Sequence, residues 1–111
     1  MIIRIWHGYT SPENAEAYEN ILKTEVMHEI EGKQIAGFRE IRLLRKEAAD
    51  EVKFITTILF DSMEAVKAFA GEDYEKAFVP EAARKVLKRF DERVEHYEVK
   101  LELKYPSTRI M

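Results

Sequence analysis

Two histidines are the side chains of this sequence best suited to proton transfer. His7 lies near the end of the first expected strand, and His96 lies in the last one. Imidazole is the side chain whose ordinary pKa lies nearest neutrality, which suits a general acid or base. If the first and last strands are neighbours in a sheet, we expect the two histidines to lie close together. The alternative is a hydrogen-bonded His7 at a strand end and a His96 on a solvated face.

The same residues allow a second interpretation as a metal site. His96 and Glu98 share one strand face and, with His7, could imitate an iron site of two histidines and one carboxylate. That strand face continues with alternating charges as far as Lys104, which is typical of a solvated row of ion pairs. The sequence has no cysteine and no zinc-binding spacing. We therefore expect no metal.

Four aromatic residues could line a pocket for a flat ligand: Trp6, Phe69, Tyr74 and Phe78. Binding sites are mostly apolar with a few polar groups. The Tyr74 hydroxyl is suited to bind a substrate oxygen. Aromatic residues at these spacings more often fill a core, and this alternative stays open.

The elements that must position these side chains follow from the hydrophobic pattern. We expect strands at 2–9, 38–46, 52–60 and 93–105, helices at about 12–32, 63–70 and from residue 80, and a short helical turn at 73–78. Thr10 or Ser11 should cap the first helix, and Thr10 with Glu13 fits a capping box. Asp61 or Ser62 should cap the second helix. The third helix should present one apolar face made of Ala83, Val86, Leu87 and Phe90.

The order strand, helix, strand, strand, helical segment, strand predicts an α+β fold of the ferredoxin-like, split βαβ type with a four-stranded antiparallel sheet. The first strand is apolar or aromatic on both faces, whereas a strand with one solvated face alternates. The last strand is longer than usual and would overhang a small sheet. Both features predict a homodimer that forms through the open sheet face and the C-terminal strand.

Composition limits the remaining possibilities. The 111 residues suffice for one domain, assigned to residues 1–105 with a C-terminal tail at 106–111. The net charge of −3 and the absence of a basic run argue against a nucleic-acid partner. No apolar stretch reaches membrane-spanning length and no signal-peptide pattern is present, so we expect a cytoplasmic protein without a membrane partner.

Four segments resemble the antibiotic biosynthesis monooxygenase-like proteins of the dimeric α/β-barrel superfamily. They are IIRIWHGYTSPENAEAYENIL, GFREIRLLRKE, EVKFITTILFDSMEAVKAFAGEDYEKAFVP and RFDERVEHYEV, which together span residues 2–99. The resemblance implies a homodimer with one pocket per subunit, between the sheet and the helical segment after the third strand. It also implies oxidation without metal or flavin, because the deprotonated aromatic substrates of quinone-forming members react with oxygen directly. The protein would supply an apolar cavity, groups that stabilise the anion, and proton transfer.

Heme-degrading relatives carry an Asn on the first strand, a Trp on the helix after the third strand and a His on the next helix. This chain offers His7, Phe69 and about Phe78 at those places. We therefore predict a cofactor-independent monooxygenase that oxidises a polycyclic or quinol-type aromatic with O2. Two alternatives stay open, a non-catalytic dimer that binds a small molecule or serves a structural role, and, less favoured, a heme-degrading monooxygenase. The predicted catalytic residues are His7, His96 and Tyr74, and the predicted substrate-binding residues are Trp6, Phe69 and Phe78.

Overall fold

The computed structural model of the chain describes residues 1–107. In chain order the elements are β1 (Ile2–Thr10), the 3₁₀ turn η1 (Pro12–Asn14), α1 (Ala15–Ile21), the π-helical turn η2 (Leu22–Val26), α2 (Met27–Lys33), β2 (Phe38–Glu47), β3 (Val52–Phe60), α3 (Met63–Ala70), α4 (Glu81–Val86), β4 (Arg89–Phe90) and β5 (Glu95–Glu98). The predicted bounds of β3 and α3 are confirmed.

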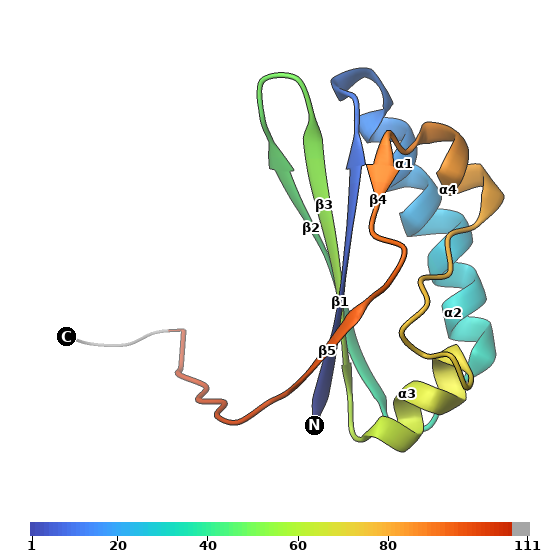
Figure 1. The fold of residues 1–111 in the computed structure, drawn as a ribbon. Coiled ribbons are helices and arrows are strands. Elements are labelled where there is room, and N and C mark those ends of the chain that lie inside the picture. Colours follow the sequence, from blue (N-terminus) through green and yellow to red (C-terminus); the bar gives the residue numbers. More distant parts are fainter. Residues whose placement is uncertain (108–111) are drawn as a thin grey trace.

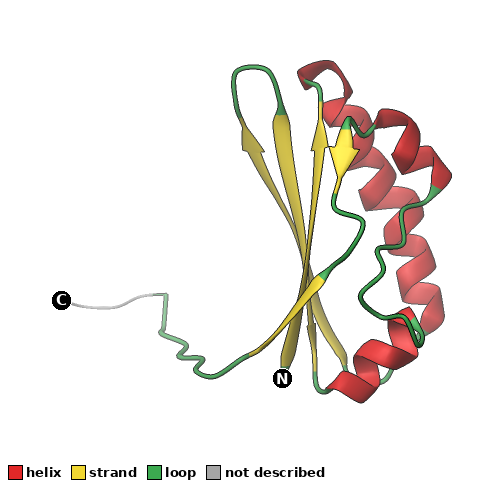
Figure 2. Ribbon diagram, viewed as in Figure 1, coloured by secondary structure: helices red, strands yellow, loops and turns green. Residues whose placement is uncertain are grey.

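The strands form one antiparallel sheet in the order β2-β3-β1, with β4 and β5 both paired to the remaining edge of β1. The helices cover one face of this sheet, and within residues 1–107 nothing covers the other face (Figures 1 and 2). This is the predicted α+β, ferredoxin-like architecture. The covered face carries the even-numbered residues of β1, because successive side chains of a strand point to opposite faces.

The fourth edge strand is interrupted, which the sequence pattern did not predict. Gly8 pairs with Phe90 in β4, but Ile5 pairs with Glu95 in β5, so residues 91–94 lie between the two paired segments. Asp91 N still donates to His7 O of β1 at 3.0 Å. Residues 92–94 leave β1 and pair with the loop at 75–77, where Val94 N donates to Glu75 O at 2.7 Å.

The helical turn expected at 73–78 is present only as one turn, in which Lys76 N donates to Asp73 O at 3.1 Å. It does not continue, because Lys76 pairs with Arg93 in a β-bridge. The third helix, α4, ends at Val86, so Phe90 does not belong to its apolar face as predicted. Phe90 lies in β4 and pairs with Gly8 of β1.

The first helix is one rod from Ala15 to Lys33, interrupted by the π-helical turn η2. Met27 N donates to Leu22 O, a bond one residue longer than in an α-helix. The predicted capping box is wrong: Ser11 makes no side-chain cap bond, and the buried Thr10 Oγ1 has no hydrogen-bond partner among the described residues. By contrast, Ser62 Oγ accepts from Ala65 N at 3.2 Å and caps α3 as predicted.

The buried core divides into two clusters along the covered face. One surrounds Tyr18 and Phe54, whose rings meet edge to face with centroids 4.8 Å apart. The other surrounds Phe60 and Val66 under α3. In β1, Arg4 lies between Ile2 of the second cluster and Trp6, which packs against the first. The gap between the two clusters is where the cavity described below lies.

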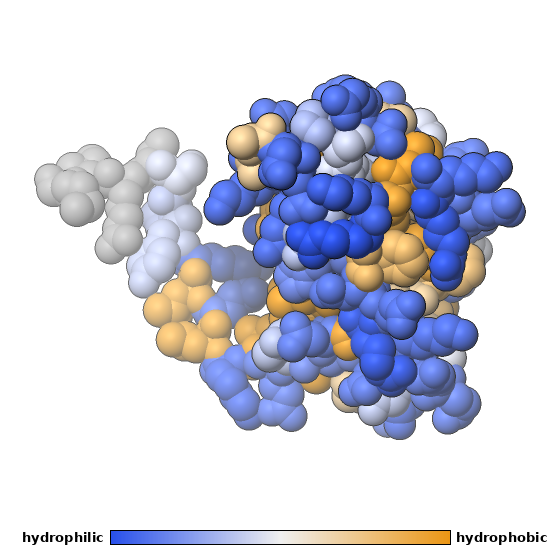
Figure 3. Space-filling model, turned by 45° about the horizontal axis from the view of Figure 1, so that its top comes forward, coloured by the Kyte–Doolittle hydropathy of each residue, from blue (hydrophilic) through white to orange (hydrophobic). Residues whose placement is uncertain are grey.

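The last strand stops at Glu98, so the expected strand to residue 105 is wrong for the single chain. After Val99 N donates to Met1 O, the chain has no further strand partner within the described residues and runs away from the body as an extended arm, residues 99–107 (Figure 1). Leu101 is 76% exposed, and Figure 3 shows hydrophobic atoms gathered on this arm. Most of the predicted tail at 106–111 lies outside the described residues.

Candidate functional site

A cavity of about 230 Å³ lies between the covered sheet face, the helical rod, the end of α3 and the loop at 76–80. Its apolar lining includes Leu22, Val26, Met27, Ile41, Ile58, Ala77, Val79 and Val94. We call it the helix-sheet cavity. Two of its wall residues come from the π-helical turn, a feature frequent at functional sites.

All three predicted substrate-binding aromatics line the helix-sheet cavity. Trp6 comes from β1, Phe69 from α3 and Phe78 from the loop. Phe78 is 79% exposed, so this ring forms part of the rim and contributes little to the core. Their placement agrees with a ligand-binding role, which stays a prediction.

Trp6 owes its position to the glycine that follows two residues later on the same strand face. A Cβ on Gly8 would lie 2.6 Å from Trp6 Cη2, so the indole occupies the space of the missing side chain. Trp6 Nε1 also donates to Asp91 O at 2.7 Å, in the segment between β4 and β5. The interrupted edge strand therefore helps to hold this wall of the cavity.

Arg4 provides a positive charge in the lining, and it is only 7% exposed. Its Nη1 donates to Tyr74 O at 2.6 Å and to His96 Nε2 at 3.1 Å. Its guanidinium carbon lies 5.7 Å from the centre of the Phe69 ring. Burial lowers the pKa of Arg4 to about 10, because desolvation disfavours the charged form.

His96 and Tyr74 are hydrogen-bonded to Arg4 but are not part of the cavity lining. Their rings meet edge to face with centroids 5.5 Å apart. Because arginine only donates, His96 Nε2 must accept, which leaves the proton on Nδ1. That Nδ1 is buried without a partner among the described residues. Burial, and next the charge of Arg4, lower the pKa of His96, so the imidazole is held neutral.

His7 lies on the other face of the sheet, away from the helix-sheet cavity. It belongs to the odd-numbered residues of β1, whereas His96 pairs in register with Arg4 on the covered face. Its Nδ1 lies 3.1 Å from Asp91 Oδ2. The expected proximity of the two histidines is therefore wrong, because neighbouring strands alone do not put side chains on one face. Catalytic roles for His7, His96 and Tyr74 stay predictions.

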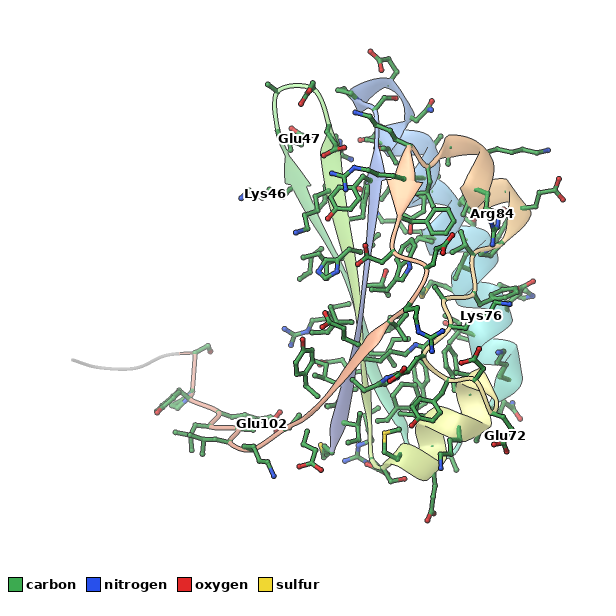
Figure 4. All side chains as sticks on the ribbon, in the orientation of Figure 1. Lys46, Glu47, Glu72, Lys76, Arg84 and Glu102 are labelled. Carbon is green, nitrogen blue, oxygen red and sulfur yellow. The ribbon has the colours of Figure 1, made fainter. Side chains whose placement is uncertain are left out.

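The rim of the cavity carries further charge. Lys33 and Lys76 line it together with a single acid, Glu29. Lys33 Nζ donates to Phe69 O at 3.1 Å and lies 4.7 Å from the centre of that ring. Figure 4 shows Lys76 on the loop that runs along the helical side. The cavity thus has an excess of positive charge, although the whole chain carries −3.

Sequence reasoning missed Arg4, the two lysines and the π-helical turn. A signal for Arg4 was present: it is the one charged residue in the apolar run Ile2–Trp6. Among residues 1–107, no group of three His, Cys, Asp or Glu side chains could hold a metal ion. No helix in that part of the chain is both long and apolar enough to cross a membrane.

Comparison with known proteins adds a family and a set of related folds. The family model described as antibiotic biosynthesis monooxygenase matches residues 1–81. No curated protein matches the sequence. A candidate antibiotic biosynthesis monooxygenase from Deinococcus radiodurans has a TM-score of 0.64 at 14% identity, covering 96% of this chain and 100% of that chain. A second candidate, from Bacillus cereus, has a TM-score of 0.62 at 17% identity, covering 94% and 97% of the two chains.

The heme-degrader MhuD from Mycobacterium tuberculosis, a structure with two hemes bound in its active site, is also similar. Its TM-score is 0.54 at 19% identity, covering 94% of this chain and 100% of that chain. At such identities these structures show the shared fold alone.

Proposed function

Because the chain belongs to the antibiotic biosynthesis monooxygenase family, we propose that it transfers one oxygen atom from O2 to a small aromatic substrate bound in the helix-sheet cavity. The observation that carries this proposal is the cavity itself, with its aromatic lining and buried Arg4 between sheet and helical segment. Sites for drug-sized ligands measure about 300–1,000 Å³. The smaller volume here favours a substrate of one or two rings over a larger polycyclic one.

The proposed reaction needs no cofactor. A naphthol and O2 would give a naphthoquinone and water: the ring carbon para to the hydroxyl exchanges its hydrogen for an oxygen atom. The second oxygen atom leaves as water with that hydrogen and the hydroxyl proton. The chain's part would be to bind the ring between Trp6 and Phe69, to exclude water and to stabilise the naphtholate by positive charge.

One of the related structures holds heme, but the residues that line the helix-sheet cavity do not fit this group. Heme iron is bound by His, Cys, Met or Tyr side chains. The described lining contains no His or Cys, and burial raises the pKa of Tyr18, which opposes the phenolate form. Met27 is left as a weak donor. We therefore propose no heme-dependent step.

Oxygen uptake with 1-naphthol in the presence of a metal chelator tests the proposal. We expect consumption of one O2 per naphthoquinone formed and one labelled oxygen atom in the product from ¹⁸O2. Ala77→Phe should abolish uptake by filling the cavity, whereas Ala48→Phe at the exposed β2–β3 turn should leave it unchanged. Uptake that survives Ala77→Phe in a folded protein would place the chemistry elsewhere.

A second candidate is a protein that binds such a ligand without turnover. It is favoured by the finding that none of the three predicted catalytic side chains lines the cavity. Binding of 1-naphthol by calorimetry together with no oxygen uptake would select this function. Turnover would exclude it.

We also propose that two copies pair through the uncovered sheet face. That face carries apolar side chains from β1, β2, β3 and β5, among them Ile3, Ile5, Leu44, Ile55, Leu59 and Tyr97. Leu44 and Tyr97 are 46% and 49% exposed, and an apolar sheet face of this kind marks an interaction site. The extended arm would then lie against the second copy.

A further inference from the structure

We infer that Arg4 is an anion-binding residue and that the ligand of the helix-sheet cavity is a small aromatic compound with a carboxylate or phenolate group. This inference rests on the proposed cavity site and specifies its ligand class. The charged oxygen would meet the guanidinium at the inner wall, and the ring would lie against Trp6 and Phe69.

The first support is that the buried positive charge of Arg4 has no counter-ion. A buried charge is stabilised by a paired ion or by hydrogen bonds to all its polar atoms. Of the Arg4 nitrogens, only Nη1 has hydrogen-bond partners among the described residues, and both of these are uncharged. The N–H groups of Nε and Nη2 therefore stay available, and their parallel directions match the two oxygens of a carboxylate.

The other arginines show that the missing acid is specific to this position. Arg39, Arg42, Arg45, Arg89 and Arg93 each form an ion pair with a carboxylate. Arg84 has no such pair but is exposed to water. Within residues 1–107, Arg4 is the buried arginine without an acid within 4.0 Å. An anionic group of a bound ligand would supply the missing ion-pair partner of Arg4.

The second support is the charge at the rim. Lys33 and Lys76 outnumber Glu29 there, so an anion gains favourable interaction before it reaches Arg4. Because the chain as a whole is negative, this local excess is not a consequence of composition.

His96 acts here as a positioning residue. Its neutral Nε2 accepts from Nη1 and fixes one side of the guanidinium, while Tyr74 O fixes the same nitrogen from the loop. Since neither partner neutralises Arg4, the full positive charge stays available to a ligand.

A matched pair of probes tests the inference by isothermal titration calorimetry at neutral pH and low salt. 2-Naphthoate carries the anion, and 2-naphthalenemethanol has the same ring without it. We expect naphthoate to bind at least about tenfold more tightly, the effect of one charged hydrogen-bonded pair. Arg4→Met should remove this preference and leave the affinity for naphthalenemethanol within about threefold, since it keeps an apolar wall of similar length.

Two further variants keep the test sharp. Arg4→Lys should keep part of the preference for naphthoate, because lysine retains the charge but cannot donate two parallel hydrogen bonds to a carboxylate. Arg39→Met removes an exposed charge that is paired with Asp61 and does not line the cavity, so this variant should retain the whole preference. Equal affinity of the natural protein for both probes, or a preference that survives in folded Arg4→Met protein, overturns the inference. If neither probe binds, the cavity is not a ligand site and the inference fails with it. If the preference holds but no oxygen uptake occurs, only the oxygenase proposal fails.

Discussion

Arg4 Nη1 and His96 Nε2 lie 3.1 Å apart on neighbouring strands, and each determines the state of the other. The guanidinium can only donate, so the imidazole must accept and stay neutral. A protonated His96 would lose this hydrogen bond and place a second positive charge beside a buried one. The pair therefore couples the inner wall of the cavity to pH.

This coupling predicts a loss of stability in mild acid. The pKa of His96 is lowered in the folded state, so the unfolded chain takes up the proton first, near pH 6.5. The free energy of unfolding should fall as the pH drops below about 6.5, by at most about 1.4 kcal/mol per pH unit for one proton. His96→Gln keeps an acceptor for Arg4 but does not titrate, so its decline between pH 7 and 5 should be shallower. Urea unfolding at several pH values measures the difference.

His28 provides the control, because it is exposed on α2. His28→Gln should follow the natural protein across the same pH range. If His96→Gln and His28→Gln decline alike, the pair is not the source of the pH dependence.

Replacing Arg4 should leave the fold intact. Arg4→Met removes a buried charge that no acid compensates, at the loss of two hydrogen bonds. Removing a buried charge that has no counter-ion also removes its desolvation cost, which offsets the lost hydrogen bonds. We expect a free energy of unfolding no more than about 1 kcal/mol below that of the natural protein, and thermal unfolding followed by circular dichroism measures it. A loss of several kcal/mol would show that Arg4 mainly holds the loop through Tyr74.

Two glycines should respond in opposite ways to the same substitution. Gly8→Ala forces the indole of Trp6 away from its place and should destabilise by about 1–3 kcal/mol. Gly32→Ala meets nothing within 4 Å in α2 and should stabilise by about 0.5–1 kcal/mol. Because Trp6 is the single tryptophan, its fluorescence should change in the first variant and not in the second. An unchanged spectrum for Gly8→Ala would contradict the packing described.

Two phenylalanines separate a rim residue from a core residue. Phe78→Ala should change the free energy of unfolding by no more than about 0.5 kcal/mol, because the ring is exposed. Phe54→Ala should lower it by about 3–5 kcal/mol, because that ring is fully buried. If Phe78 contacts ligand, its loss should still weaken naphthoate binding. A large stability loss in Phe78→Ala would assign this ring to the core.

The proposed pairing of two copies predicts a dimer by analytical ultracentrifugation. Ile55→Glu places a charge in the middle of the uncovered face and should yield monomers. Leu103→Glu on the arm should weaken the dimer. Thr24→Glu, on the helical side, should leave it unchanged. A natural protein that sediments as a monomer would contradict the pairing.

Much of the fold follows from local signals in the sequence. β3 and α3 match their predicted bounds, because a β-branched run and a Ser cap are recognisable within a few residues. The last strand was predicted too long, because its alternation indicates a pleated surface but not whether a partner strand is present. The interruption at 92–94 depends on hydrogen bonds to 75–77, which no local pattern contains.

The candidate site was predictable only where local sequence signals and the strand order identify its residues. Trp6, Phe69 and Phe78 were found as aromatics on elements that the topology brings together. His7 and His96 were paired by strand adjacency, but the register of β5 places His96 opposite Arg4 on the covered face and not beside His7. Arg4 was passed over because a single arginine in a strand is ordinarily a surface residue, and only its burial gives it a role.

The π-helical turn is the place in the cavity wall that can lose a residue with least disturbance. This turn holds one residue more than an α turn, so the rod carries an extra residue at 22–26 without losing either end. Removing one residue within the turn would restore ordinary α-helical hydrogen bonds and leave the residues after it facing as they do now. Met27, Ile30 and Lys33 would then stay in the lining. A deletion in the regular helix before the turn would instead rotate these three residues by about 100° about the helix axis and remove them from the wall.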